Sequence, residues 1–278
     1  MRLGGPCAAS ADLERASFAA SPMTTAILSA LPEEQSSLVH HLSRPQRLTH
    51  AGRAFWTGDI EGRAVVLALS GIGKVAAATT ATALIERFGV ARIVFTGVAG
   101  GMGDGVQVGD VVVAEDYLQH DLDVSPLFPR WEVPGYARHR FACDAGLTAL
   151  LSGAASAYIT GATGRFDPKT SFQATNGTFA PPRLHHGLVV SGDRFVSAAD
   201  EVLRLRTALQ EGGHDVLAVE MEGAAVAQVC HDYGVPFAAM RTISDRADDT
   251  AHVDFAAFVQ TVASRYAQHV MLGFLRLL

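Results

Sequence analysis

The sequence contains few cysteines and little charge, and it has no long apolar segment. Its 278 residues include three cysteines and 18% charged residues. Cys7, Cys143 and Cys230 are far apart and form no CxxC pair, which argues against a structural metal and for a reducing compartment, by default the cytoplasm. No apolar run reaches the length of a membrane span. Membrane proteins and disulfide-stapled secreted domains are therefore not expected.

The sequence also lacks a strong excess of charge of either sign. Its formal net charge is −6, so nothing favours nucleic acid or an anionic membrane as a partner. Residues 1–22 have no continuous apolar core of the kind that a secretory signal needs. We expect residues 1–22 to be a disordered N-terminal tail and residues 23–278 to form one domain. A Gly/Thr/Pro/Asn-rich insertion is expected at 161–183.

Strand-like apolar segments alternate with helical patterns from residue 24 onward. No internal repeat or linker interrupts them, so the pattern predicts a single-domain three-layer α/β/α sandwich with a central mixed, largely parallel sheet. Buried strands are expected over residues 24–31, 91–95, 108–114, 187–191, 216–219 and 236–243, with a strand pair over 53–59 and 63–69. Helices are expected after Pro32, from about residue 74 to 88, over 144–155 and 200–210, from about 222 to 233, and over 255–278.

Carboxylates stand at the ends of three expected strands. Glu34 follows the first strand, Glu222 lies in the first turn of a helix, and Asp245 follows the run 236–243. A carboxylate in a first helical turn meets unpaired N–H groups and the positive end of the helix dipole, which favour its ionised form. One such acid can simply cap its helix. Because ligands of these sheets bind at the carboxyl ends of the strands, three acids there favour a charged site.

Two turns rich in small residues are expected at the same edge of the sheet. They are SGIGK at residues 70–74 and TGVAGG at 96–101. Glycine lets the backbone approach a ligand closely, but the spacing matches neither a P-loop nor a dinucleotide site. A tight turn remains the plainer explanation of each. The adjacent histidine pairs at 40–41 and 185–186 have no third ligand at metal spacing, so no metal site is expected.

Eight stretches together resemble the nucleoside phosphorylase and nucleosidase superfamily, and most closely the 5′-methylthioadenosine/S-adenosylhomocysteine nucleosidases. They occur in the order found in that family, from about residue 24 to the C-terminus, and the resemblance implies a nucleoside phosphorylase-like fold. The stretches are ALPEE (30–34), SGIGKVAAA (70–78), TGVAGG (96–101), VGDVVV (108–113), QHDLDV (119–124), SGDRF (191–195), AVEMEGAAVAQVCHDYGVPF (218–237) and RTISDRAD (241–248).

The resemblance implies hydrolysis of an N-glycosidic bond, without metal or cofactor. Such a site needs an acid at the base and anions near the sugar. By position, Asp245 would protonate adenine N7, Glu34 would activate a water, and Glu222 would hold the ribose hydroxyls. Phe195 would stack on the adenine, and the backbone of Val196 would read its edge. The other residues implied to bind the substrate are Met221, Val98, Ala99, Gly100 and Ser244.

The resemblance also implies an apolar pocket for the 5′ group and a homodimer. The pocket would comprise Leu31, Ile72 and Phe255, completed by a loop of the partner subunit that carries Leu127, Phe128 and Pro134. That assignment would account for apolar residues in the proline-rich loop 119–134.

Three departures from the family leave alternatives open. Val98 replaces a serine of the family's TGSAGG loop, Pro32 stands where many relatives carry an acid, and the stretch 161–183 is longer than in the compact bacterial members. The alternatives are a phosphate-dependent nucleoside phosphorylase, a nucleosidase for another 5′-modified nucleoside, and a nucleoside-binding protein without catalysis. The presence of Glu34, Glu222 and Asp245 together argues against the last of these.

Overall fold

A computed structural model describes residues 23–161, 181–246 and 264–278 of the chain. The expected N-terminal tail lies outside the described residues, as does nearly all of the expected insertion, at 162–180. Residues 247–263 also lie outside them, so the first part of the expected closing helix and Phe255 are not described. Within the described part of the chain, no helix has the length and apolar character needed to cross a membrane.

Ten strands and six helices make up the described residues. The strands are β1 (Thr25–Ser29), β2 (Ser43–His50), β3 (Arg53–Ile60), β4 (Arg63–Leu69), β5 (Arg92–Gly101), β6 (Val111–Gln119), β7 (Arg140–Ala142), β8 (Leu184–Ser191), β9 (Val216–Glu220) and β10 (Phe237–Asp245). The helices are α1 (Pro32–Val39), α2 (Lys74–Phe88), α3 (Ala145–Ile159), α4 (Ala199–Glu211), α5 (Gly223–Tyr233) and α7 (Ser264–Leu277).

Four of the helices begin or end at residues that their sequence signals indicate. Helix α1 starts at Pro32, which has no N–H to leave unpaired in a first turn. Helix α3 starts after Asp144, whose carboxylate accepts from the N–H of Leu147 at 2.8 Å. Helices α2 and α5 end at Gly89 and Gly234, both in the left-handed conformation that glycine adopts without strain. Local sequence thus determines where these four helices start or stop.

Five of the strands form a closed path. Strand β10 pairs in parallel with β5 and antiparallel with β6; β6 then pairs in parallel with β8, and β8 with β9. The path closes because β9 pairs antiparallel with the end of β5 at Gly100 and Gly101. From β5 the sheet extends through β1, β4 and β3 to β2. The sheet is mixed as predicted, since the ten strand pairings described comprise five parallel and five antiparallel ones.

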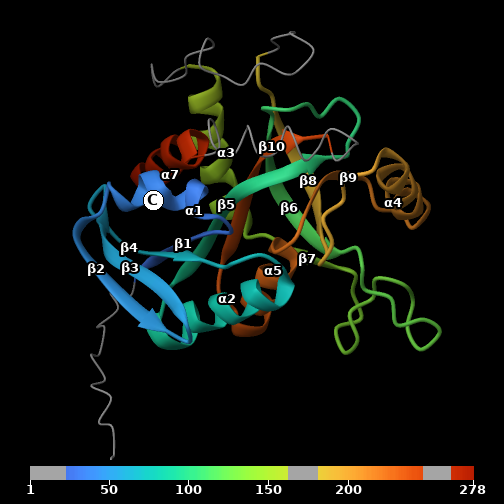
Figure 1. Cartoon of the computed structure of the whole chain (residues 1–278), viewed down its shortest axis with the longest axis horizontal. Coiled ribbons are helices and arrows are strands. Elements are labelled where there is room, and N and C mark those ends of the chain that lie inside the picture. Colours follow the sequence, from blue (N-terminus) through green and yellow to red (C-terminus); the bar gives the residue numbers. More distant parts are fainter. Residues whose placement is uncertain (1–22, 162–180, 247–263) are drawn as a thin grey trace, which may run out of the picture.

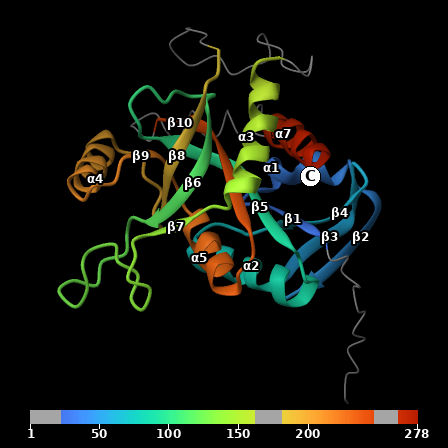
Figure 2. The same cartoon turned by 180° about the vertical axis from the view of Figure 1, so that it is seen from behind.

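Helices cover both faces of the sheet, as Figures 1 and 2 show. Alternate residues of a strand point to opposite faces, so Ala26 and Leu28 of β1 pack in the cluster that contains α2 and α5. Ile27, between them, packs in the cluster that contains α1, α3 and α7. A third, smaller cluster joins α4 to β8 and β9 through Leu209 and Val216. The predicted three-layer α/β/α arrangement is confirmed.

Several segments differ from expectation; among them, β7 is a short strand paired with β6 where no strand was expected. The glycine-rich stretch 96–101 is not a loop but the second half of β5, because β10 pairs with it along 96–100 and β9 pairs with its end. Strand β2 was not expected, because its sequence SRPQRLTH has no apolar run; it pairs with β3 at the edge of the sheet.

Candidate active site

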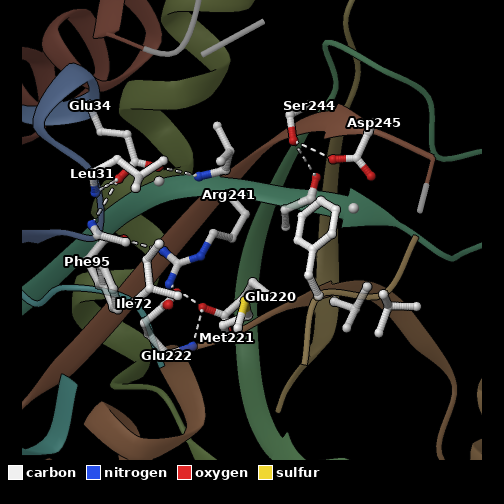
Figure 3. A pocket seen from close by; sticks show the side chains of 18 of the residues that line it. Leu31, Glu34, Ile72, Phe95, Glu220, Met221, Glu222, Arg241, Ser244 and Asp245 are labelled. Carbon is white, nitrogen blue, oxygen red and sulfur yellow. Dashed lines mark hydrogen bonds and ion pairs between the residues drawn. The ribbon is translucent and has the colours of Figure 1, made fainter. Parts of the chain in front are cut away.

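A cavity of about 450 Å³ opens at the ends of β5, β9 and β10. In Figure 3 Glu34, Glu222 and Arg241 lie toward one side of it, whereas Ser244 and Asp245 lie toward the other. The residues that line it are Ala30, Leu31, Glu34, Ile72, Phe95, Gly97, Val98, Ala99, Gly100, Arg194, Phe195, Val196, Val219, Glu220, Met221, Glu222, Arg241, Ser244 and Asp245.

Glu34 is a buried carboxylate held by backbone amides. Its Oε2 accepts from the N–H groups of Ala30 and Leu31 at 2.9 Å each, and its Oε1 accepts from the N–H of Val98 at 3.1 Å. The side chain is thereby fixed between the start of α1 and strand β5. Burial raises the pKa of Glu34 above its usual value, although these hydrogen bonds act in the opposite direction. Glu34 is therefore a rigid carboxylate with increased affinity for a proton.

Gly97 allows Glu34 to lie this close to β5. A Cβ atom at position 97 would lie 3.1 Å from Oε1 of Glu34 and 3.4 Å from its carboxyl carbon. That distance is shorter than an ordinary carbon–oxygen contact, so a side chain here would displace the carboxylate. The glycines of TGVAGG thus serve the site from within a strand.

Glu220 and Arg241 form an ion pair at the base of the cavity. Nη2 of Arg241 lies 2.8 Å from Oε2 of Glu220, and both side chains are at most 3% exposed. Glu220 also accepts from the Ser191 hydroxyl and from the N–H groups of Glu222, at 3.2 Å, and Gly223, at 2.9 Å. The two charges of this buried cluster, those of Glu220 and Arg241, are therefore paired with each other.

Glu222 directly precedes α5 and is held less completely than Glu220. Its Oε1 accepts from the N–H of Gly73 at 2.8 Å, and none of the described residues forms a hydrogen bond with its Oε2. Burial and then the nearby charge of Glu220 raise the pKa of Glu222 to about 8. Glu222 therefore presents one unengaged carboxylate oxygen in a cavity that it helps to line.

Gly223 places the first turn of α5 next to these carboxylates. A Cβ atom at position 223 would lie 2.2 Å from Cε1 of Tyr117, whose ring is fully buried beside it. Only glycine lets the helix start against this ring, where its amide can reach both oxygens of Glu220. The helix N-terminus thus contributes to neutralising Glu220.

Ser244 and Asp245 mark the other side of the cavity. Both are at most 2% exposed, and the Ser244 hydroxyl lies 2.8 Å from Oδ2 of Asp245. They end β10 where its register with β5 shifts, and Asp245 is the partner of Gly100. The irregularity turns consecutive residues of the strand end toward the cavity.

Apolar side chains line the rest of the cavity. Leu31 and Met221 are half-buried, Val196 is buried, and Phe195 and Ile72 are 38% and 61% exposed. Three residues of β5 that were also selected from the sequence belong to the lining: Val98, Ala99 and Gly100. A flat apolar ligand would find both hydrophobic walls and charged ends here.

The chain matches the family model of the phosphorylase superfamily over residues 24–276. It is 34% identical over 254 residues to the 5′-methylthioadenosine/S-adenosylhomocysteine nucleosidase of Anoxybacillus flavithermus, covering 90% of this chain and 97% of the relative. The nucleosidase of Neisseria meningitidis, solved in complex with methylthio-immucillin-A, has a TM-score of 0.78 at 33% identity and covers 92% of this chain and 99% of its own. This chain belongs to the nucleosidase family within that superfamily.

A further solved structure broadens the family context. Futalosine hydrolase of Helicobacter pylori is 29% identical with a TM-score of 0.76, covering 92% of this chain and 98% of its own. Family membership confirms the predicted fold and the predicted enzyme class, an N-glycosyl hydrolase.

The nucleosidase cavity brings together most of the residues selected from the sequence, but not all. Leu127 is 83% exposed, Phe128 is 38% exposed and Pro134 is exposed, and none of the three lines the cavity of their own chain. They lie on the loop between β6 and β7 that projects from the domain in Figure 1. Phe255 lies outside the described residues.

Six side chains of the nucleosidase cavity were not selected from the sequence: Ala30, Phe95, Arg194, Val219, Glu220 and Arg241. Arg241 had a visible signal, because an arginine in the middle of the apolar run FAAMRTIS must find a buried partner. Glu220 had the same signal at the end of VLAVE. Their pairing, across 21 residues of sequence, is apparent only in the fold.

Proposed function

We propose that this enzyme hydrolyses the N-glycosidic bonds of S-adenosylhomocysteine and 5′-methylthioadenosine, releasing adenine and the corresponding thioribose. The observation that carries the proposal is the placement of Asp245 on one side of the cavity and of Glu34 and Glu222 on the other. Cleavage creates positive charge on the ribose and negative charge on the departing base. An acid at the base and carboxylates at the sugar suit both charges.

In this proposal Glu222 binds the ribose. Its Oε2 accepts hydrogen bonds from the ribose hydroxyls, while the N–H of Gly73 holds Oε1. Met221, beside it in the sequence, supplies an apolar surface under the sugar ring.

Glu34 acts as the general base in the same proposal. Three backbone amides hold its carboxylate in place, and its raised pKa favours removal of a proton from water. A base acting on a water and an acid acting on the leaving group from opposite sides follow the logic of an inverting glycosidase.

Asp245 is proposed as the acid that protonates adenine N7. It is 2% exposed and lies beside the Ser244 hydroxyl, and an acid in this role requires a partly desolvated site. The aromatic ring of Phe195 would stack on the adenine, and the backbone of Val196 would read its edge.

Water rather than phosphate is the nucleophile in this proposal. Phosphorylases gather their anion with several cationic groups. Among the described residues, the two cations that line the cavity are paired, Arg241 with Glu220 and Arg194 with Glu201, and Lys74 beside it is paired with Asp121.

The test is turnover of methylthioadenosine in phosphate-free buffer and in about 50 mM phosphate, a range that spans typical substrate affinities. We expect equal rates of adenine release by chromatography and an unphosphorylated sugar product by mass. Dependence on phosphate with a ribose 1-phosphate product would contradict water as the nucleophile and leave the adenine site intact.

The 5′ group and the assembly are also part of the proposal. Leu31 and Ile72 would form an apolar subsite with Phe255, and the exposed Leu127 and Phe128 would complete the subsite of the partner in a homodimer. Unpaired cysteines, Cys143 and Cys230, support a reducing compartment such as the cytoplasm.

A different 5′ group is the second candidate. Val98 removes a hydroxyl from the cavity wall, and the chain is similar to a futalosine hydrolase as well as to the adenosine-derived nucleosidases. A panel of 5′-modified nucleosides, with free base read by chromatography, ranks the substrates by kcat/KM.

A further inference from the structure

Lys74, Asp121 and Asp193 form a closed ring of contacts beside the cavity. The backbone N–H of Lys74 donates to Oδ1 of Asp193 at 2.7 Å, and its ammonium donates to Oδ1 of Asp121 at 2.5 Å. The N–H of Asp193 donates in turn to Oδ2 of Asp121 at 2.9 Å. Three segments far apart in the sequence are joined in this way. We call these three residues the clamp.

The clamp connects two segments at the substrate cavity. The N–H of Gly73, next to Lys74 in the chain, holds the carboxylate of Glu222 at 2.8 Å. Asp193 lies two residues before Phe195, which lines the cavity from another segment. The clamp therefore links the turn 70–74, which holds Glu222, to the loop that carries Phe195.

The contacts of the clamp differ from those of an ordinary exposed ion pair. Exposed pairs contribute little, but the side chain of Lys74 is 16% exposed and its ammonium also reaches Oε1 of Gln119 at 3.2 Å. The pKa of Asp121 is lowered overall: burial acts to raise it, but the bonds from Lys74 and Asp193 outweigh this effect. Two of the contacts bind backbone amides, which fixes the path of the chain as well as the charge.

Asp193 also replaces a helix cap that α2 lacks. The residue before α2 is Gly73, with a φ of 93°, and it offers no side chain to the free amides of the first turn. The Asp193 carboxylate takes that place from another segment, and a Cβ atom at position 73 would lie 3.0 Å from it. The start of α2 thus depends on the loop that carries Phe195.

We propose that Lys74, Asp121 and Asp193 are positioning residues for the hydrolysis, which set the ribose-binding carboxylate and the adenine-stacking ring in one arrangement before substrate binds. The proposal rests on the proposed function of the cavity. It gives a role to the QHD and GDR segments, which the catalytic roles leave unexplained. Since Glu34 and Asp245 belong to other segments, opening the clamp leaves them in place. The cost of ordering the two segments then appears in binding rather than in chemistry.

The test compares Lys74→Met and Lys74→Arg with the wild type, and with Arg276→Met as the matched control. Arg276 pairs with Glu61, which follows β3 at the end of the sheet away from the cavity. We expect Lys74→Met to raise KM for methylthioadenosine by about tenfold while kcat changes by less than about threefold, as the loss of charged hydrogen bonds to binding would give. Lys74→Arg should raise KM less than Lys74→Met does, and Arg276→Met should have the KM and kcat of the wild type.

Adenine binding by calorimetry is the readout that does not depend on turnover. The Kd for adenine should rise in Lys74→Met in parallel with KM. If Lys74→Met does not fold, Asp121→Asn takes its place, because it keeps the shape and loses the charge. If KM and the adenine Kd of Lys74→Met are both within about twofold of the wild-type values, the proposed positioning role of the clamp is contradicted. If the wild-type protein binds adenine but releases no adenine from the substrates, the proposed function alone is contradicted. The change in adenine Kd between the wild type and Lys74→Met then still tests the positioning role of the clamp.

Discussion

Two carboxylates at one strand-to-helix junction have contrasting surroundings. Glu220 ends β9 and accepts from Arg241, Ser191 and the first amides of α5. Glu222, two residues later, accepts from the N–H of Gly73 and leaves Oε2 unengaged among the described residues. Both are buried, at 7% and 6% exposure. Burial alone therefore does not distinguish these two carboxylates; the number of engaged oxygens does.

The contrast follows from the side that each carboxylate faces. Arg241 reaches Glu220 from β10, so the ion pair closes the base of the cavity and holds β9 to β10. Glu222 lies beyond the strand end, where the one hydrogen bond that the described residues donate to its carboxylate comes from the turn before α2. A buried carboxylate with an unengaged oxygen is costly to keep ionised, as its raised pKa records, unless a ligand supplies donors.

The largest expected effect is on kcat and concerns the two carboxylates proposed to act as acid and base. Asp245→Asn and Glu34→Gln should each lower kcat by about 10² to 10⁴, the usual contribution of general acid–base catalysis. Folding should survive in both. Because three amides donate to Glu34 and Gln offers one acceptor oxygen, Glu34→Gln should also lose about 1–3 kcal/mol of unfolding free energy. Steady-state kinetics with denaturant unfolding checks both variants, and near-normal turnover in a folded variant removes that residue from the mechanism.

The next effect tests the contrast directly through stability. Glu220→Gln leaves the Arg241 charge buried without a counter-charge, so it should cost about 3–5 kcal/mol of unfolding free energy. Glu222→Gln keeps an acceptor for Gly73 and should change that quantity by less than about 1 kcal/mol at neutral pH or stabilise the fold. Urea unfolding of both variants measures the difference. Equal losses would mean that the two carboxylates do the same structural work.

The smallest effect is a pH dependence that belongs to Glu222. Its pKa is about 8 in the folded protein and near 4.5 otherwise, so the folded state binds the proton more tightly. The stability that protonation of Glu222 contributes to the folded state is fully present below pH 4.5 and is lost as the pH rises through about 8. The wild type should therefore lose unfolding free energy relative to Glu222→Gln across this window, by an amount on the order of a few kcal/mol. A difference independent of pH would contradict the raised pKa.

The charged site could be anticipated from the sequence because acids at the ends of apolar runs are conspicuous. Glu34, Glu222 and Asp245 all line one cavity, as their strand-end positions indicated. Their separate chemical roles came from family resemblance, since spacing does not tell a base from an acid.

Interactions between distant segments could not be anticipated. Nothing local links Arg241 to Glu220, or Lys74 to Asp121 and Asp193, because the order of strands decides which segments meet. The second half of β5 was expected to be a loop because its glycines have low strand propensity. Pairing with two other strands outweighs that propensity.

The closed path of β5, β10, β6, β8 and β9 also bears on aggregation. A strand inside a closed path has neighbours on both sides and cannot pair with a strand of another molecule. Among the described strands, the open end of the long sheet falls to β2, whose register with β3 shifts between Ser43 and Gln46, next to Pro45. Proline gives no ladder donor, and Arg44 and Arg47 add charge of one sign. The apolar strands that carry the cavity are thereby shielded from edge-to-edge association, and β2, at the open end of the long sheet, is poorly suited to it.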